Sequence, residues 1–187
     1  MLTIIVALLL ALLLSPVAPA EAPNAVFDLA GRPVHPLDDS AARGVVLVFV
    51  RTDCPLSNRY APVLNALYDK YSALGISFWL IYVDPHQSRD QVRHYAAGYG
   101  YRARVAIDPR HLLVHTSGAR VTPEAVVFVH HVLVYRGRID NRYPELGLSL
   151  PRPTRSDLNL TLSAIVSHHP VPEKTTRAIG CFISDLE

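Results

Sequence analysis

The sequence predicts a single α/β domain with a mixed central sheet, in which parallel β-α-β units come first and an antiparallel hairpin and a closing helix follow. Three observations predict this class. Apolar, β-branched runs alternate with segments of helical periodicity. Two apolar runs in the second half are separated only by His130-His131, which indicates a tight hairpin. Hydrophobic residues make up 50% of the chain and charged residues 18%, which is typical of a packed core.

The first half of the chain is expected to supply two central strands, each followed by a helix. Residues 44–50 and 76–83 are continuous apolar runs, which are typical of strands buried on both faces, and a short strand around residues 26–29 precedes them. After the first central strand, apolar positions recur with helical spacing at Tyr60, Leu64, Leu67 and Tyr71. The helix after the second begins with a capping-box pattern at Ser88 and extends to about residue 99.

The second half is expected to supply the remaining strands and the last helix. Short apolar runs at residues 105–107, 125–129 and 132–135 predict three strands, of which the last two form the hairpin. One or two helical turns over residues 110–116 follow the first of these strands. A helix over residues 157–167 has its apolar residues on one face and closes the domain.

Residues 1–20 are expected to be a signal peptide. Residues 2–14 are almost entirely Leu, Ile, Val and Ala, a run shorter than the roughly 20 residues of a membrane-spanning helix. Small-x-small patterns end at Ala20 and Ala22, so cleavage is expected near one of them and the mature protein would be periplasmic or secreted. The alternative is an uncleaved anchor, which would tie the protein to a membrane.

Charge and histidine placement restrict the kinds of ligand. The formal net charge is +2 and the basic residues are scattered, which argues against binding of nucleic acid. Among the nine histidines, His111 and His115 lie one helical turn apart, but no third ligand stands at a spacing typical of a metal site. No resident metal is therefore expected, and a copper site that joins Cys54 to a histidine remains an alternative.

Cys54 is the candidate nucleophile. It directly follows a buried strand and stands where the next helix begins, with Pro55 at a position that suits the first helical turn. The N–H groups and the dipole of a helix N-terminus favour a thiolate. Arg51 and Arg59 would add positive charge, and Ser57 would donate a hydrogen bond to the sulfur. The alternative is that Cys54 is a small buried core residue.

Two motifs resemble the thioredoxin superfamily. A strand, the turn Asp53-Cys54-Pro55 and a helix interrupted at Ala61-Pro62 are similar to its active-site unit, and Val121-Thr122-Pro123 before a strand is similar to its cis-proline loop. The longer segments at residues 52–60 and 135–140, together with Gly180-Cys181 near the end, resemble the sequences of exported redoxin-domain proteins. The resemblance covers residues 24–167, leaves residues 168–187 as a proline-containing tail and implies a thioredoxin-like fold.

The resemblance also implies an activity. A protein of this family would be a thiol-disulfide oxidoreductase that acts on protein thiols or disulfides through Cys54, with Thr122 and a cis Pro123 as the edge where substrate docks. Since the cysteine carries the electrons, no organic cofactor is implied.

Three departures from the family's patterns keep other functions open. Ser57 stands where thioredoxins have the second cysteine, Arg51 stands where peroxiredoxins have Thr or Ser, and Asn58 stands where copper-handling relatives have a cysteine. The alternatives are a peroxide-reducing redoxin that uses Cys54, and a non-catalytic module that binds copper or a partner protein.

Cys181 is the other thiol of the chain. Because Cys54 has no resolving cysteine nearby, we expect Cys181 to resolve a mixed disulfide on Cys54 and to form an intramolecular bond with it. The alternatives are a permanent structural bond between the two and pairing of Cys181 with another molecule. Cys54 alone stands at a helix N-terminus and is expected to be the more reactive thiol.

Overall fold

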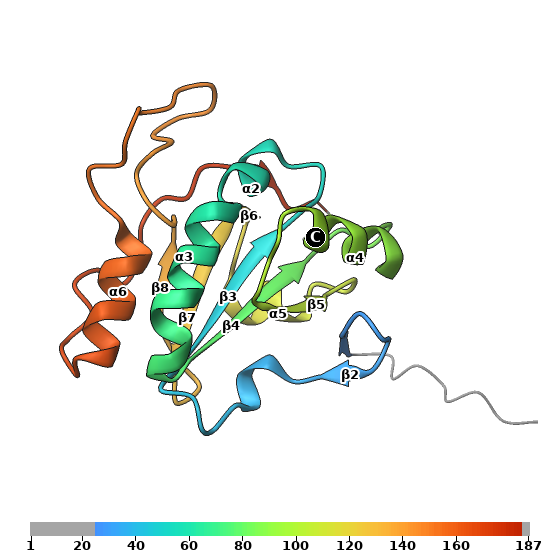
Figure 1. The fold of residues 1–187 in the computed structure, drawn as a ribbon, viewed down its shortest axis with the longest axis horizontal. Helices are drawn as coiled ribbons and strands as arrows, with labels where there is room; N and C mark the ends of the chain where they lie inside the picture. The colour runs from blue at the N-terminus through green and yellow to red at the C-terminus, as the bar shows by residue number, and fades with distance from the viewer. Residues whose placement is uncertain (1–24, 185–187) are drawn as a thin grey trace, which may run out of the picture.

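The structure is a computed structural model that describes residues 25–184 (Figure 1). The signal-peptide interpretation of residues 1–20, with its cleavage sites, therefore lies outside the described residues. Within residues 25–184, no helix is long and apolar enough to cross a membrane.

A seven-stranded mixed sheet forms the centre of the domain, with the strand order β2-β1-β5-β4-β3-β7-β8 (Figure 1). Its strands are β1 (Val26–Phe27), β2 (Pro33–Val34), β3 (Gly44–Val50), β4 (Ile76–Tyr82), β5 (Arg104–Ile107), β7 (Glu124–Val129) and β8 (Val132–Gly137). Strands β3, β4 and β5 run parallel, whereas β7 is antiparallel to β3 and forms the hairpin with β8. A separate two-stranded sheet pairs β6 (Val121–Thr122) with β9 (Cys181–Phe182).

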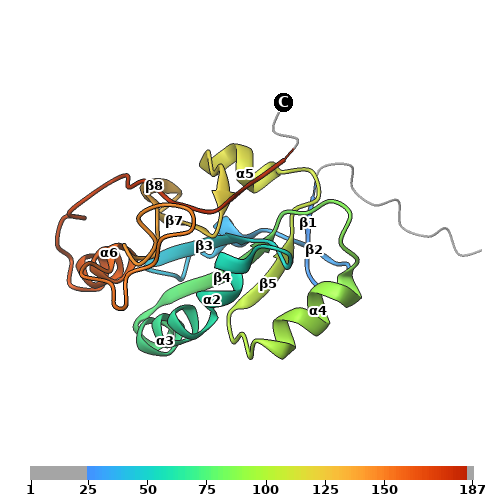
Figure 2. The same cartoon turned by 90° about the horizontal axis from the view of Figure 1, so that it is seen from above.

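Helices cover both faces of the central sheet. The helices are α2 (Pro55–Arg59), α3 (Ala61–Tyr71), α4 (Arg89–Gly98), α5 (Leu112–Ser117) and α6 (Asp157–Val166), with the short 3-10 turns η1 (Pro36–Asp38) and η2 (Ser72–Leu74). Figure 2 shows α3, α4 and α6 on one face and α5 on the other. This layering explains why the two central strands are apolar throughout, since each of their faces is covered.

Two hydrophobic clusters fill the space between the sheet and these helices. Alternate residues of β3 enter different clusters, because successive side chains of a strand point to opposite faces. Val46 and Val48 pack with residues of α3, α4 and α6, whereas Leu47 and Phe49 pack with α5 and with Ile183 of the tail. The C-terminal tail is therefore part of the second cluster.

The order of the central strands and helices agrees with the sequence prediction, and the differences are local. The helix after Cys54 divides at Tyr60 into α2 and α3, because Pro62 lacks an N–H and fits only the first turn of a helix. The short strands β2, β6 and β9 were not expected, since two residues carry no readable periodicity. The predicted division at residues 24–167 and 168–187 stays a prediction.

Candidate functional site

Cys54 lies at the carboxyl end of β3 and caps the N-terminus of α2, whose first residue is Pro55. The buried strand brings the chain to the top of the sheet, and the turn at Thr52 and Asp53 delivers the thiol to the helix. Cys54 is 0% exposed. The predicted nucleophile is thus at a helix N-terminus, but its thiol is not accessible to solvent in this structure.

The tail brings Cys181 onto Cys54. The two sulfur atoms lie 2.7 Å apart, and both cysteines are free thiols in the structure. A disulfide bond measures about 2.05 Å, so a displacement of less than 1 Å would join the two sulfurs. Figure 2 shows the tail crossing the molecule from α6 toward α5, and Cys181 itself is only partly buried.

The tail is held on both sides of the cysteine. Cys181 pairs with Thr122 in the β6–β9 ladder, and the Ile183 amide donates to the carbonyl of Arg120 at 3.0 Å. Ile183 is 5% exposed, whereas Phe182 is 77% exposed. This alternation is that of a strand with one buried face, which points Cys181 and Ile183 toward the protein and Phe182 toward solvent.

The peptide bond between Thr122 and Pro123 is cis, which confirms the sequence prediction. The Thr122 carbonyl accepts a hydrogen bond of 3.0 Å from the Cys54 thiol, so the proline loop and the cysteine meet as expected. The edge formed by Thr122, which the resemblance assigns to substrate, is paired with the protein's own tail at Cys181.

The surroundings give the two thiols opposite pKa shifts. Burial raises the pKa of Cys54, but hydrogen bonds from the Cys181 thiol, the Ser57 backbone amide and the Thr122 side chain lower it by more, so its pKa lies below the ordinary value. For Cys181, burial, the hydrogen bond to Cys54 and the charge of Cys54 together raise the pKa to about 12. The pKa order agrees with the expectation that Cys54 is the more reactive thiol, whereas its burial opposes that expectation.

The structure corrects the expected role of the Ser57 side chain. The Ser57 hydroxyl is buried and makes no hydrogen bond, so it does not donate to the sulfur of Cys54. The Ser57 backbone amide supports the thiolate instead, as the N–H groups of a first helical turn do.

Neither of the two arginines that were expected to add positive charge near the Cys54 sulfur takes that role. Arg51 forms a bidentate pair with Asp53 at 3.0 and 2.8 Å and lies 3.6 Å from Asp84, so its charge is shared with two carboxylates. Its remaining effect is to lower the pKa of Cys181. Arg59 is exposed and lines a hollow of about 490 Å³ between α3 and α6, away from the thiols.

Sequence reasoning missed the residues that anchor the tail before it reaches Cys181. The Arg136 amide donates to the Lys174 carbonyl and the Thr176 amide donates to the Arg136 carbonyl, each at 3.0 Å. The Tyr135 and Thr176 hydroxyls lie 2.7 Å apart. No local pattern of the sequence marks these contacts, because they join residues about 40 positions apart.

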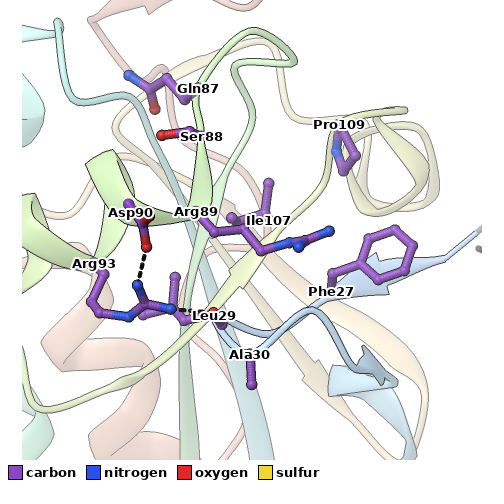
Figure 3. A pocket seen from close by; sticks show the side chains of 10 residues that line it. All are labelled: Phe27, Leu29, Ala30, Gln87, Ser88, Arg89, Asp90, Arg93, Ile107 and Pro109. Atoms are coloured by element: carbon purple, nitrogen blue, oxygen red, sulfur yellow. Dashed lines mark hydrogen bonds and ion pairs between the residues drawn. The ribbon is translucent and has the colours of Figure 1, made fainter.

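A second hollow of about 590 Å³ lies beside α4, where Arg93 bonds to Asp90 and to the Leu29 carbonyl (Figure 3). None of the predicted site residues lines it. In the described part of the chain, no group of three or more His, Cys, Asp or Glu side chains is placed to hold a metal ion. His111 instead contacts the Val83 carbonyl through its ring at 2.7 Å.

Comparisons with known proteins identify relatives of the chain in sequence and in fold. The profile of the AhpC/TSA family matches residues 18–139. The thiol-disulfide oxidoreductase ResA of Bacillus thuringiensis (strain Al Hakam) is 34% identical over 104 residues, which are 55% of this chain and 58% of that protein. The match thus spans less than two thirds of that relative's length.

Two solved structures extend the similarity to the fold. An uncharacterized conserved protein from Geobacillus kaustophilus has a TM-score of 0.75 and 26% identity, over 90% of this chain and 91% of its own. An uncharacterized thioredoxin-like protein from Porphyromonas gingivalis has a TM-score of 0.58 and 16% identity, over 80% of this chain and 95% of its own. The predicted thioredoxin-like α/β fold is confirmed.

Proposed function

Since the chain belongs to the AhpC/TSA family, we propose that it is a thiol-disulfide oxidoreductase whose working pair is Cys54 and Cys181. One observation carries the proposal: the tail holds the sulfur of Cys181 2.7 Å from that of Cys54. The name of the ResA relative agrees with this activity. The partner would be a protein that carries a dithiol or a disulfide.

The chemistry is an exchange of two electrons and two protons. In the oxidised form, Cys54 and Cys181 share a disulfide; in the reduced form each carries a thiol or thiolate, and the partner carries the disulfide. The helix N-terminus and the Ser57 amide hold the Cys54 thiolate, and Cys181 supplies the second thiol that Ser57 cannot supply. Thr122 and Pro123 position both sulfurs, and no organic cofactor takes part.

Export is part of the proposal. A disulfide-forming pair works where thiols are oxidised, and the apolar segment with its small-residue sites at Ala20 and Ala22 fits a secretory signal. The protein would act in the periplasm or after secretion, or at a membrane surface if the segment is retained.

The test is a redox titration of the full chain in glutathione buffers, with the Cys54–Cys181 bond measured by alkylation and mass spectrometry. We expect a reversible bond with a midpoint well above about −300 mV, whereas a permanent structural bond would lie below that value. Two free cysteines, or a bond between chains, after mild oxidation would refute the proposal.

Activity assays separate the proposed oxidoreductase from the two alternatives, a peroxidase and a non-catalytic binding module. We expect the protein to catalyse insulin reduction by dithiothreitol and the Cys54→Ser variant to lose this activity, with the stability of the reduced variant within about 1–2 kcal/mol of wild type because the change is small. Turnover of hydrogen peroxide in place of disulfide exchange would favour the peroxidase. Stoichiometric Cu(I) binding without turnover would favour the binding module.

A further inference from the structure

We propose that the partner's sulfur enters the exchange at Cys181 and not at Cys54, so that the mixed disulfide joins the partner to the tail. The inference rests on the proposed function and reverses the order expected from the sequence, in which Cys54 meets the partner first. It also names the partner of this half-reaction as a protein dithiol that gives up two electrons.

Burial is the first argument. Cys54 is 0% exposed, and the segment that covers it is Cys181 with its neighbours. Cys181 is only partly buried, and Phe182 and Ser184 beside it are exposed. A protein thiol approaching the closed site therefore reaches Cys181 before Cys54.

The direction of attack is the second argument. In thiol-disulfide exchange the incoming sulfur approaches along the line of the breaking bond, from the side opposite the leaving sulfur. For an attack on Cys54, that side is closed to solvent, because Cys54 is 0% exposed and its sulfur contacts the Thr122 carbonyl at 3.0 Å. Cys181, in contrast, is only partly buried, so an incoming thiol can approach this residue from solvent.

The attachment of the tail is the third argument. Direct attack on Cys54 would require the β6–β9 pairing to open and the buried side chain of Ile183 to leave the second hydrophobic cluster. The backbone contacts of Arg136 with Lys174 and Thr176 hold the tail further upstream. Attack on Cys181 needs none of these contacts to break.

The leaving group is the fourth argument. Attack on Cys181 expels Cys54 as a thiolate, and hydrogen bonds from the Ser57 backbone amide and the Thr122 side chain lower the pKa of Cys54. A thiol with a lower pKa leaves faster. The reverse reaction would need Cys181 as the attacking thiol, and its pKa is raised to about 12. The surroundings of Cys54 therefore assist its departure when Cys181 is attacked.

The half-reaction balances. The first partner thiolate bonds to the sulfur of Cys181, the Cys54–Cys181 bond breaks, and its electron pair stays on Cys54. The second partner thiolate then attacks the first partner sulfur, the partner–Cys181 bond breaks, and the Cys181 thiolate takes up a proton. The partner has become a disulfide and the protein a dithiol.

The test maps the mixed disulfide in the oxidised full chain. The oxidised protein is mixed with glutathione, quenched in acid within milliseconds to seconds, digested and analysed by mass spectrometry. We expect glutathione on the peptide that contains Cys181. Glutathione on Cys54 would overturn the inference and leave the proposed function intact, because the reversible bond would still be present. Absence of a reversible bond in the titration above would refute both.

Single-cysteine variants give a second readout that does not depend on a short-lived intermediate. With 5,5′-dithiobis(2-nitrobenzoate), we expect Cys54→Ser, which keeps Cys181, to react at least about tenfold faster than Cys181→Ser, which keeps the covered Cys54. Adding Gly180→Val to Cys181→Ser should release the tail and remove most of that difference. Equal rates of the two single variants would show that the tail does not protect Cys54 and would overturn the inference.

Discussion

Gly180 of the tail lies against the carbonyl of Thr122: a Cβ atom on Gly180 would sit 2.1 Å from that oxygen. The same oxygen accepts the hydrogen bond of the Cys54 thiol at 3.0 Å. The absence of a side chain at Gly180 therefore allows the tail to approach the proline loop closely enough for Cys181 to reach Cys54. The contact explains why a glycine precedes the cysteine.

Gly180→Ala is expected to lift the tail from the proline loop. Because the added Cβ would meet backbone rather than a flexible side chain, we expect a loss of about 1–3 kcal/mol in the free energy of unfolding of the reduced protein. Alkylation of Cys54 should become faster and the yield of the Cys54–Cys181 bond should fall. The matched control is Gly98→Ala, since a Cβ on Gly98 meets no atom within 4 Å. Equal behaviour of the two variants would contradict the role of Gly180.

The two thiols of the reduced protein are expected to titrate far apart. The pKa of Cys54 lies below its ordinary value and that of Cys181 is raised to about 12, so ¹³C chemical shifts of labelled cysteines should show one thiolate forming well before the other. In Cys54→Ser, the pKa of Cys181 should fall, because the hydrogen bond and charge of Cys54 are lost. A Cys181 titration that is the same in both proteins would show that the thiols are not coupled.

The same shifts predict how pH changes the stability of the reduced protein. A raised folded-state pKa at Cys181 contributes stability below the unfolded value of about 8.5, and this contribution is lost as pH rises toward 12. The lowered pKa of Cys54 contributes above its unfolded value and is lost as pH falls. Denaturant titrations from pH 8 to 11 should therefore show a steeper loss for wild type than for Cys181→Ser, and parallel curves would contradict the assignment.

Ser57→Ala is expected to leave the chemistry unchanged. The hydroxyl of Ser57 is buried without a hydrogen-bond partner, and the backbone amide that supports the Cys54 thiolate remains in the variant. We expect the exchange rate to change by less than about twofold and the stability to stay the same or rise slightly, because an unsatisfied buried hydroxyl is removed. A large loss of rate with unchanged stability would show that the hydroxyl does act on the sulfur.

Tyr60→Phe is expected to destabilise the joint between α2 and α3. The Tyr60 hydroxyl donates to Asp140 at 2.6 Å, and Asp140 is only 2% exposed. Removing the donor leaves a buried carboxylate with one fewer partner, which costs about 1–3 kcal/mol. Thermal unfolding measures the loss. Tyr99→Phe is the matched control, because Tyr99 is 40% exposed and its hydroxyl makes no hydrogen bond within residues 25–184.

Most of the fold was readable from local signals. Strand β3 shows as an unbroken apolar run because both of its faces are buried, and the capping box at Ser88 marks the start of α4 with its reciprocal hydrogen bonds to Gln91. The break at Tyr60 was partly readable from Pro62. The two-residue strands β6 and β9 were not readable, because their pairing joins segments from distant parts of the sequence.

The sequence by itself determined that Cys54 follows a buried strand at the start of a helix and that Thr122-Pro123 directly precedes β7; the cis isomer followed only from the family resemblance. Only the tertiary structure decided that Cys181 covers Cys54, that the tail occupies the edge at Thr122, and that the Ser57 hydroxyl has no part in holding the sulfur. The reason is physical. Helix starts and buried strands depend on neighbouring residues, whereas a contact between cysteines 127 positions apart depends on how the whole chain packs.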